Sequence, residues 1–190
     1  MNSILNRIIR AAQLDKAFYQ EVEADQSLTQ EALLVVIIVS LAGGVGAFIS
    51  TMFSGRIGAA LSALVITAVL GVANYYIWSY TTYVIGTNLF SGDAEPGELL
   101  RVLGYASGPR LLGLLGFIPC LGGLINLAGA IWALVAGFFG VREALDLDTT
   151  ETLVTVVLGW LVIMIITAVV SSIFGLGALG ITAALGTLRN

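Results

Sequence analysis

Long apolar stretches separated by short charged segments dominate the sequence. A helix needs about 20 mostly apolar residues to cross the hydrocarbon core of a bilayer. Four stretches are this long and uncharged apart from Arg110, at residues 32–55, 57–92, 102–141 and 152–188. The third stretch is long enough for two short crossings, and Pro119 with Gly122-Gly123 indicates a turn between them.

The pattern therefore predicts an all-α fold, a polytopic membrane helix bundle with five transmembrane helices. The expected spans are residues 32–54, 57–85, 100–118, 121–141 and 152–174. The second span is expected to end at the polar Gly86-Thr87-Asn88 segment, and a short Gly-rich helix over residues 175–188 follows the fifth span. Residues 31–190 form the membrane domain, and residues 1–30 form a separate N-terminal segment.

The N-terminal segment has the pattern of an amphipathic helix. Its apolar residues recur at helical spacing, at Ile4, Leu5, Ile8, Ala11, Ala12, Tyr19 and Val22. Polar residues such as Arg7, Arg10 and Lys16 fall mostly on the other side. Such a helix lies on the cytoplasmic surface of a membrane, or it packs on the cytoplasmic loops of its own chain; the pattern allows both.

Composition excludes several classes of protein. The chain is 58% hydrophobic and 11% charged, whereas soluble domains carry about 25% charged residues, so a soluble monomer is excluded. The formal net charge of −4 argues against nucleic-acid binding. The chain has no His and one Cys, Cys120, which removes disulfide frameworks, Cys/His zinc sites and His-based catalysis. We expect no catalytic residues, no metal and no cofactor, and hence a protein that is not an enzyme.

Basic residues near the span ends predict the orientation. With a cytoplasmic N-terminus, the inner side holds Arg7, Arg10, Lys16, Arg101 and Arg142. The outer side then holds only Arg56 and Arg189, and all 12 acidic residues of the chain fall on the inner side. The bias predicts a protein integral to the plasma (inner) membrane, with its N-terminus inside and its C-terminus outside.

The segment around Gly108-Pro109 predicts a kink in the third span. Pro109 cannot donate a backbone hydrogen bond, and it disfavours helical angles at the residue before it. Arg110 follows the break, and a charge at membrane depth is either functional or extends to the interface. We expect its guanidinium to meet freed carbonyls or a carboxylate, the candidates being Glu95, Glu98, Asp146 and Asp148. Asn126, in the fourth span, is expected to hydrogen-bond between helices.

Several motifs carry a resemblance to a known family. They are Phe18–Glu23, Gln30-Glu31-Ala32, Leu100–Ala106 with Pro109, Ile118-Pro119, Ile131-Trp132 and Gly140–Leu145. On these residues the chain resembles the Yip (Ypt-interacting protein) domain proteins, and specifically their bacterial branch. The residues singled out for a functional or structural role are Glu98, Arg101, Gly104, Tyr105, Gly108, Pro109, Arg110, Trp132, Arg142 and Glu143.

The resemblance implies a five-spanning protein with a cytoplasmic N-terminus. Eukaryotic members of the family bind Rab-type GTPases and take part in vesicle traffic and membrane shaping. The leading hypothesis is a non-enzymatic protein that organises membrane or scaffolds partners. Its partners would be the lipid bilayer and other membrane proteins or a homo-oligomer. One alternative is a transporter or channel for a small solute or lipid, built around the broken third span. Another is an accessory subunit of a larger membrane complex.

Overall fold

The structure, a computed structural model, describes residues 4–187, of which residue 171 and residues 173–187 are described by their backbone alone. Every regular element in this part of the chain is a helix. In chain order the helices are α1 (Ile4–Ala12), α2 (Lys16–Ala24), η1 (Gln26–Leu28), α3 (Thr29–Phe53), α4 (Ile57–Phe90), α5 (Pro96–Ala106), η2 (Gly108–Phe117), α6 (Gly122–Ala144) and α7 (Thr149–Thr187). The predicted all-α class is confirmed.

Within the described residues, four helical segments are long and apolar enough to cross a membrane. They are Gln26–Phe53, Ile57–Phe90, Gly122–Ala144 and Thr149–Val170. Large apolar side chains such as Leu61, Val69 and Ile165 are exposed on their outer faces. Because apolar surface on this scale is unfavourable in water, lipid is the solvent of these helices.

The segment expected as the third span consists of two helices of different type. Pro96 begins α5, where Glu95 and Glu98 form a capping box and the Glu95 amide donates to Glu98 Oε2 at 3.0 Å. The α-helix ends at Ala106, and residues 108–117 continue as the 3-10 helix η2. The change of helix type occurs two residues before Pro109, which cannot donate to the preceding turn.

Two helices run further than the sequence predicts. Helix α4 continues through Gly86-Thr87-Asn88, where the Thr87 and Asn88 side chains bond to backbone carbonyls one turn back. It ends at Phe90, and the next residue, Ser91, has a left-handed φ of 57°. Helix α7 is continuous to Thr187, with no break before the Gly-rich segment. Pro is absent from α7, and each Gly costs a helix only about 1 kcal/mol. Leu188, the last residue of the expected short helix, lies outside the described residues.

The N-terminal segment forms two helices that pack on the bundle. Leu14, with φ 62°, separates α1 from α2. Ala11, Phe18, Tyr19 and Val22 are fully buried. Of the two placements that the pattern allows, the structure therefore has the helices packed on their own chain. We call residues 4–24 the N-terminal layer.

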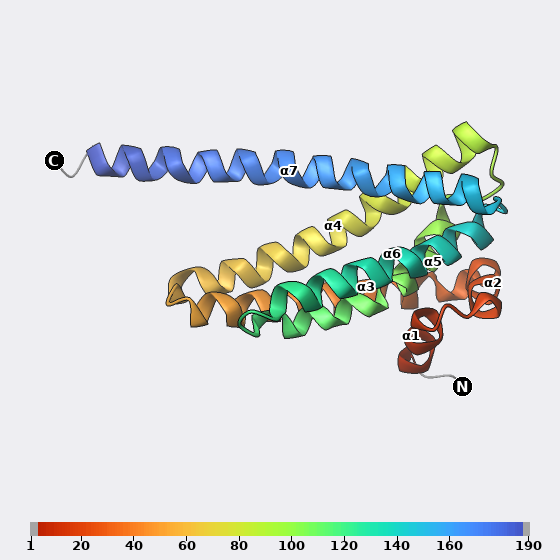
Figure 1. Ribbon diagram of the computed structural model, residues 1–190, viewed down its shortest axis with the longest axis horizontal. Coiled ribbons are helices and arrows are strands. Elements are labelled where there is room, and N and C mark those ends of the chain that lie inside the picture. Colours follow the sequence, from red (N-terminus) through yellow and green to blue (C-terminus); the bar gives the residue numbers. More distant parts are fainter. Residues whose placement is uncertain (1–3, 188–190) are drawn as a thin grey trace.

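The charges of the molecule are strongly polarised. The N-terminal layer lies at the same end as residues 91–95 and 145–148, which connect α4 to α5 and α6 to α7 (Figure 1). We call this the acidic end, because all 12 acidic residues of the sequence lie in these segments or in the adjoining helix ends. The opposite end carries residues 54–56 and 118–121, with Arg56 as its charged residue.

Gly104 lies where α5 packs closely against Ala32 of α3, and replacing it should destabilise the fold. A Cβ at this position would lie 2.9 Å from Ala32 Cβ and 3.0 Å from the Ala32 carbonyl oxygen. Gly104→Ala should lower the free energy of unfolding by about 1–3 kcal/mol, since overpacking forces the backbones apart. Thermal unfolding of the purified protein in detergent measures the effect. Gly58→Ala is the control, because a Cβ there meets nothing within 4 Å; equal melting temperatures for both variants would contradict the close approach.

Candidate functional site

Arg101 joins α5 to the end of α2. Its side chain is buried, its Nε donates to the Val22 carbonyl at 2.9 Å, and a second guanidinium nitrogen donates to the Glu23 carbonyl. Both carbonyls belong to the last turn of α2, where a helix leaves carbonyl groups without partners and favours a cation. Arg101 therefore caps α2 and fixes it to the bundle.

Tyr105 and Glu31 connect three helices one turn further along. The Tyr105 hydroxyl of α5 donates to Glu31 Oε1 of α3 at 2.7 Å, and Arg7 of α1 pairs with the other oxygen of Glu31. The Tyr105 ring meets Phe18 of α2 edge-on, with centroids 5.3 Å apart. A Cβ at Gly108 would lie 2.7 Å from Ile8 Cγ2, so glycine at this position lets α1 approach η2.

Helix α6 supplies the third set of contacts to the N-terminal layer. Glu143 is buried and accepts from Gln20 Nε2 at 2.8 Å, with Lys16 Nζ 3.3 Å from its other oxygen. Trp132 donates its indole N–H to the Ala12 carbonyl at 2.8 Å. The Arg142 side chain makes no hydrogen bond or ion pair with the part of the chain that the structure describes.

The structure thus gathers half of the singled-out residues around the N-terminal layer. Those that touch it are Arg101, Tyr105, Gly108, Trp132 and Glu143. Sequence reasoning missed their partners on α1 and α2, namely Ile8, Gln20 and the terminal carbonyls of α2. The sequence signal for a packed α2 was the aromatic pair Phe18-Tyr19, three and four residues after Asp15. In the structure both rings are buried, and the Asp15 carboxylate caps α2 by accepting from the Phe18 amide at 3.2 Å.

Carboxylates crowd around Glu23 at the acidic end. Burial, and then the charges of Glu98, Asp146 and Glu143, raise the pKa of Glu23 to about 7, against an opposing effect of Arg101. Among the residues that the structure describes, no group of three or more His, Cys, Asp or Glu side chains is placed to hold a metal ion.

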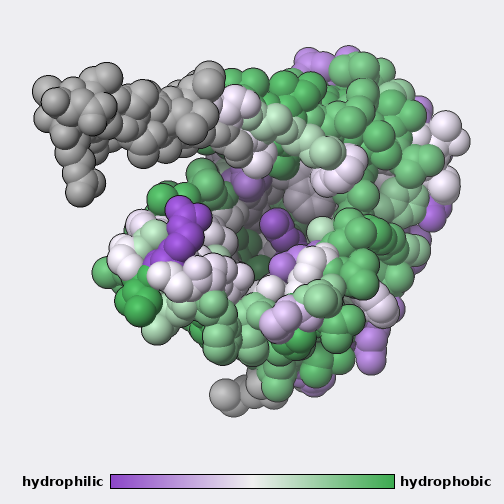
Figure 2. All heavy atoms as spheres, turned by 60° about the vertical axis from the view of Figure 1, so that its left-hand side comes forward, coloured by the Kyte–Doolittle hydropathy of each residue, from purple (hydrophilic) through white to green (hydrophobic). Residues whose placement is uncertain are grey.

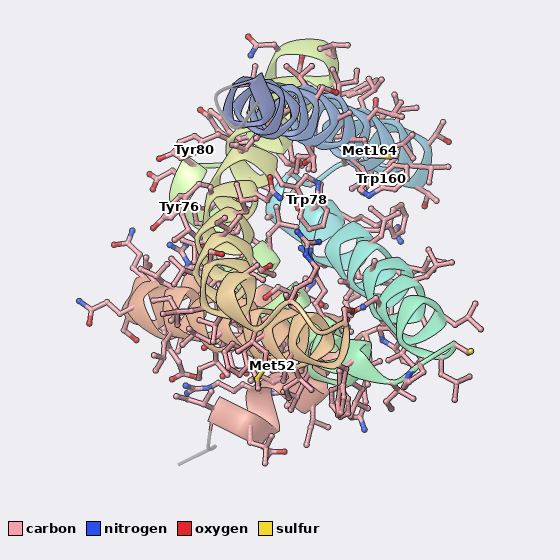
Figure 3. The ribbon with its side chains drawn as sticks, turned by 90° about the vertical axis from the view of Figure 1, so that its left-hand side faces the viewer. Met52, Tyr76, Trp78, Tyr80, Trp160 and Met164 are labelled. Carbon is pink, nitrogen blue, oxygen red and sulfur yellow. The ribbon has the colours of Figure 1, made fainter. Side chains whose placement is uncertain are left out.

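A cavity of about 490 Å³ lies between α3, α4, η2 and α6. Its polar lining comes from Arg110, Asn126, Tyr75, Ser40, Ser50, Thr67 and Ser107. Figure 3 looks along the bundle from the opposite end, with Tyr76 and Tyr80 pointing outward and Trp78 pointing between α4, α6 and α7. Helix α4 thus turns Tyr75 toward the cavity and Tyr76 and Tyr80 away from it.

The Arg110 guanidinium meets neither of its expected partners, freed backbone carbonyls or a carboxylate, among the described residues. The Arg110 backbone amide donates to the Ser107 carbonyl at 2.9 Å, but its side chain makes no ion pair or hydrogen bond there. From Glu98 to Arg110 the helix rise amounts to about 20 Å, which is beyond the reach of the two side chains. Glu98 caps α5, and Asp148 accepts from the Glu151 amide at 2.8 Å.

Asn126 also differs from its prediction. It lines the cavity beside η2, where a Cβ at Gly116 would lie 2.6 Å from its Nδ2. The expected hydrogen bond between helices is absent from the described residues.

A model of the Yip1 domain matches residues 14–183 of the chain. The match runs from the turn before α2 into α7 and so includes both the contacts of α2 and the cavity. No curated protein and no solved structure matches the sequence.

The raised pKa of Glu23 predicts how stability depends on pH. The folded protein retains a proton that the unfolded chain releases near the ordinary value of 4.5. The stabilisation from Glu23 is therefore complete below that value and is lost as pH rises through about 7. Glu23→Gln cannot ionise, so its melting temperature should fall less than that of the wild type between about pH 5 and about pH 8. Asp93→Asn, at an exposed site, should behave as the wild type; an unchanged pH profile in Glu23→Gln would refute the raised pKa.

Proposed function

As this chain belongs to the Yip1 domain family, we propose that it is a non-enzymatic, multi-pass membrane protein that scaffolds partner proteins at its acidic end. The observation that carries the proposal is the docked N-terminal layer. Through it the acidic end becomes one fixed surface instead of a set of separate loops.

Charge pairing inside the layer leaves a predominantly negative surface, on which Lys16 is an exposed cation. Arg7 pairs with Glu31, Arg10 with Asp15 and Glu21, and Arg101 with backbone carbonyls. The carboxylates that remain exposed are Glu21, Asp25, Asp93, Glu95, Asp146 and Asp148. A fixed, predominantly negative surface favours a partner with a basic surface, because complementary potentials speed encounter and select the partner.

We also propose five crossings, with the acidic end in the cytoplasm of a bacterial cell. The 11 residues of α5 and the 10 residues of η2 would rise together by about 36 Å. That length suits a hydrocarbon core of about 30 Å, so α5 and η2 can serve as the third crossing. The basic residues near the span ends favour a cytoplasmic acidic end, and the motifs shared with bacterial Yip proteins favour the inner membrane.

Native Cys120 tests this orientation. It is the single cysteine of the chain and is exposed in the turn before α6. A maleimide that cannot cross membranes should label Cys120 in intact cells. In a Cys120→Ser background, Asp93→Cys should be labelled only after the cells are opened. The reverse pattern would overturn the orientation.

Purification from mildly solubilised membranes tests the scaffold. The wild type should retain a partner at fixed stoichiometry, and high salt should release it because screening weakens contacts between exposed charges. Asp93→Lys combined with Asp146→Lys should lose the partner, because both side chains are exposed at the acidic end. The control is Ser54→Lys combined with Gly58→Lys, which adds charge at the opposite end.

Two results would contradict the scaffold. One is retention of the partner regardless of charge at the acidic end. The other is saturable solute or lipid flux by the purified protein in vesicles, lost in Arg110→Ala, which would support the transporter.

A further inference from the structure

Arg110 is a charge without a partner in the described part of its own chain, and its side chain is exposed at the cavity between α3, α4, η2 and α6. It is the one charged residue among the described residues that line this cavity, and its side chain has no ion pair or hydrogen bond within residues 4–170. All the Asp and Glu side chains of the chain lie at the acidic end. A guanidinium at membrane depth is costly unless an anion, carbonyl groups or water meet it, so the cavity must supply a partner from outside the chain.

The chemistry of the lining favours an anion that accepts several hydrogen bonds. Arg presents five N–H donors in a planar fork that matches the oxygens of a phosphate. Asn126 adds an amide, and Ser40 and Thr67 add hydroxyl groups. No carboxylate lines the cavity, so nothing there repels an anion.

The cavity has the size and access that such a group needs. Its volume of about 490 Å³ lies within the range of about 300–1,000 Å³ that is usual for small-molecule sites. Glycines on three helices, including Gly43, Gly71 and Gly113, keep side chains out of it. Figure 2 shows the molecule hollowed on the face turned forward, with hydrophilic atoms inside the hollow.

We infer that this cavity binds a phosphate group, held by Arg110 with Asn126 beside it. The group belongs either to a phospholipid headgroup or to a soluble phosphate, and the two sources share the same contacts. A lipid would place its headgroup in the cavity and its acyl chains against the apolar faces of the neighbouring helices. The inference goes beyond the scaffold and does not depend on it, because the acidic end and the cavity share no charged residue.

Binding to the purified protein in detergent tests the site. The probes are dimyristoylphosphatidylglycerol, inorganic phosphate, and dimyristoylglycerol, which has the acyl chains without the phosphate. Native mass spectrometry counts bound molecules, and titration followed by thermal unfolding gives the affinity. The wild type should bind one phosphatidylglycerol and should not bind dimyristoylglycerol at the same concentration.

Arg110→Gln should weaken binding by about tenfold to a hundredfold, the usual effect of removing a charged hydrogen-bonding partner. Arg110→Lys should retain part of the affinity, because it keeps the charge without the planar fork. Arg56→Gln is the control, since it removes the same charge from an exposed site outside the cavity. It should bind as the wild type does.

A second variant keeps the test valid if Arg110→Gln does not fold. A Cβ at Gly43 would meet only Thr67 Cγ2, at 3.9 Å. Gly43→Leu should therefore fill part of the cavity, leave Arg110 in place, and reduce binding.

The outcomes separate the two sources. Binding of phosphatidylglycerol alone identifies a lipid headgroup site, and binding of inorganic phosphate identifies a site for soluble phosphate. Binding of neither probe would overturn the inference. So would equal binding by the wild type, Arg110→Gln and Gly43→Leu, or binding of dimyristoylglycerol as tight as that of phosphatidylglycerol.

Discussion

The bond between the Arg101 guanidinium and the last carbonyls of α2 is the contact on which the acidic end depends. A helix end without partners for its carbonyls is unfavourable when buried, and Arg101 satisfies two of them from α5. With α2 fixed in this way, Phe18 can pack on Tyr105, and Gln20 can reach Glu143. Because Arg7, Arg10 and Arg101 are engaged in contacts of this kind, most of the charge left on the surface is that of carboxylates.

Two arginines nine residues apart meet opposite environments. Arg101 belongs to the α-helical part of the segment, where its own chain supplies the acceptors. Arg110 follows the change to a 3-10 helix, which carries it away from every carboxylate and into a cavity lined by small and polar residues. Arg101 stabilises the fold, whereas the N–H donors of the Arg110 guanidinium have no acceptor in the described part of the chain and can bind a ligand. Pro109 lies between these two environments and contributes to the change of helix type.

Composition and periodicity predict the helical class, because uncharged runs of this length have few stable alternatives to a membrane-spanning helix. They predict less well where a helix ends. The polar residues Thr87 and Asn88 predicted the end of the second span, yet in the structure their side chains bond to backbone carbonyls of α4 and the helix continues. The site residues Arg101, Tyr105 and Glu143 were identifiable from the sequence, but their partners lie more than 70 positions away. Local patterns carry no information on such pairs. The sequence therefore predicted only that Arg110 would meet freed carbonyls or a carboxylate, and it left two placements open for the N-terminal segment.

The central claim, that the N-terminal layer is fixed on the bundle, is tested most directly by a disulfide between Ile8→Cys and Gly108→Cys in a Cys120→Ser background. A Cβ at Gly108 would lie 3.8 Å from Ile8 Cβ, the mean separation of about 3.8 Å found in disulfides. Mild oxidation of native membranes should give the linked peptides, detected by mass spectrometry. Asn6→Cys with Gly108→Cys, in which the partner lies on the other face of α1, should not link. A failure of the first pair to link, or equal linking by both pairs, would contradict a fixed N-terminal layer.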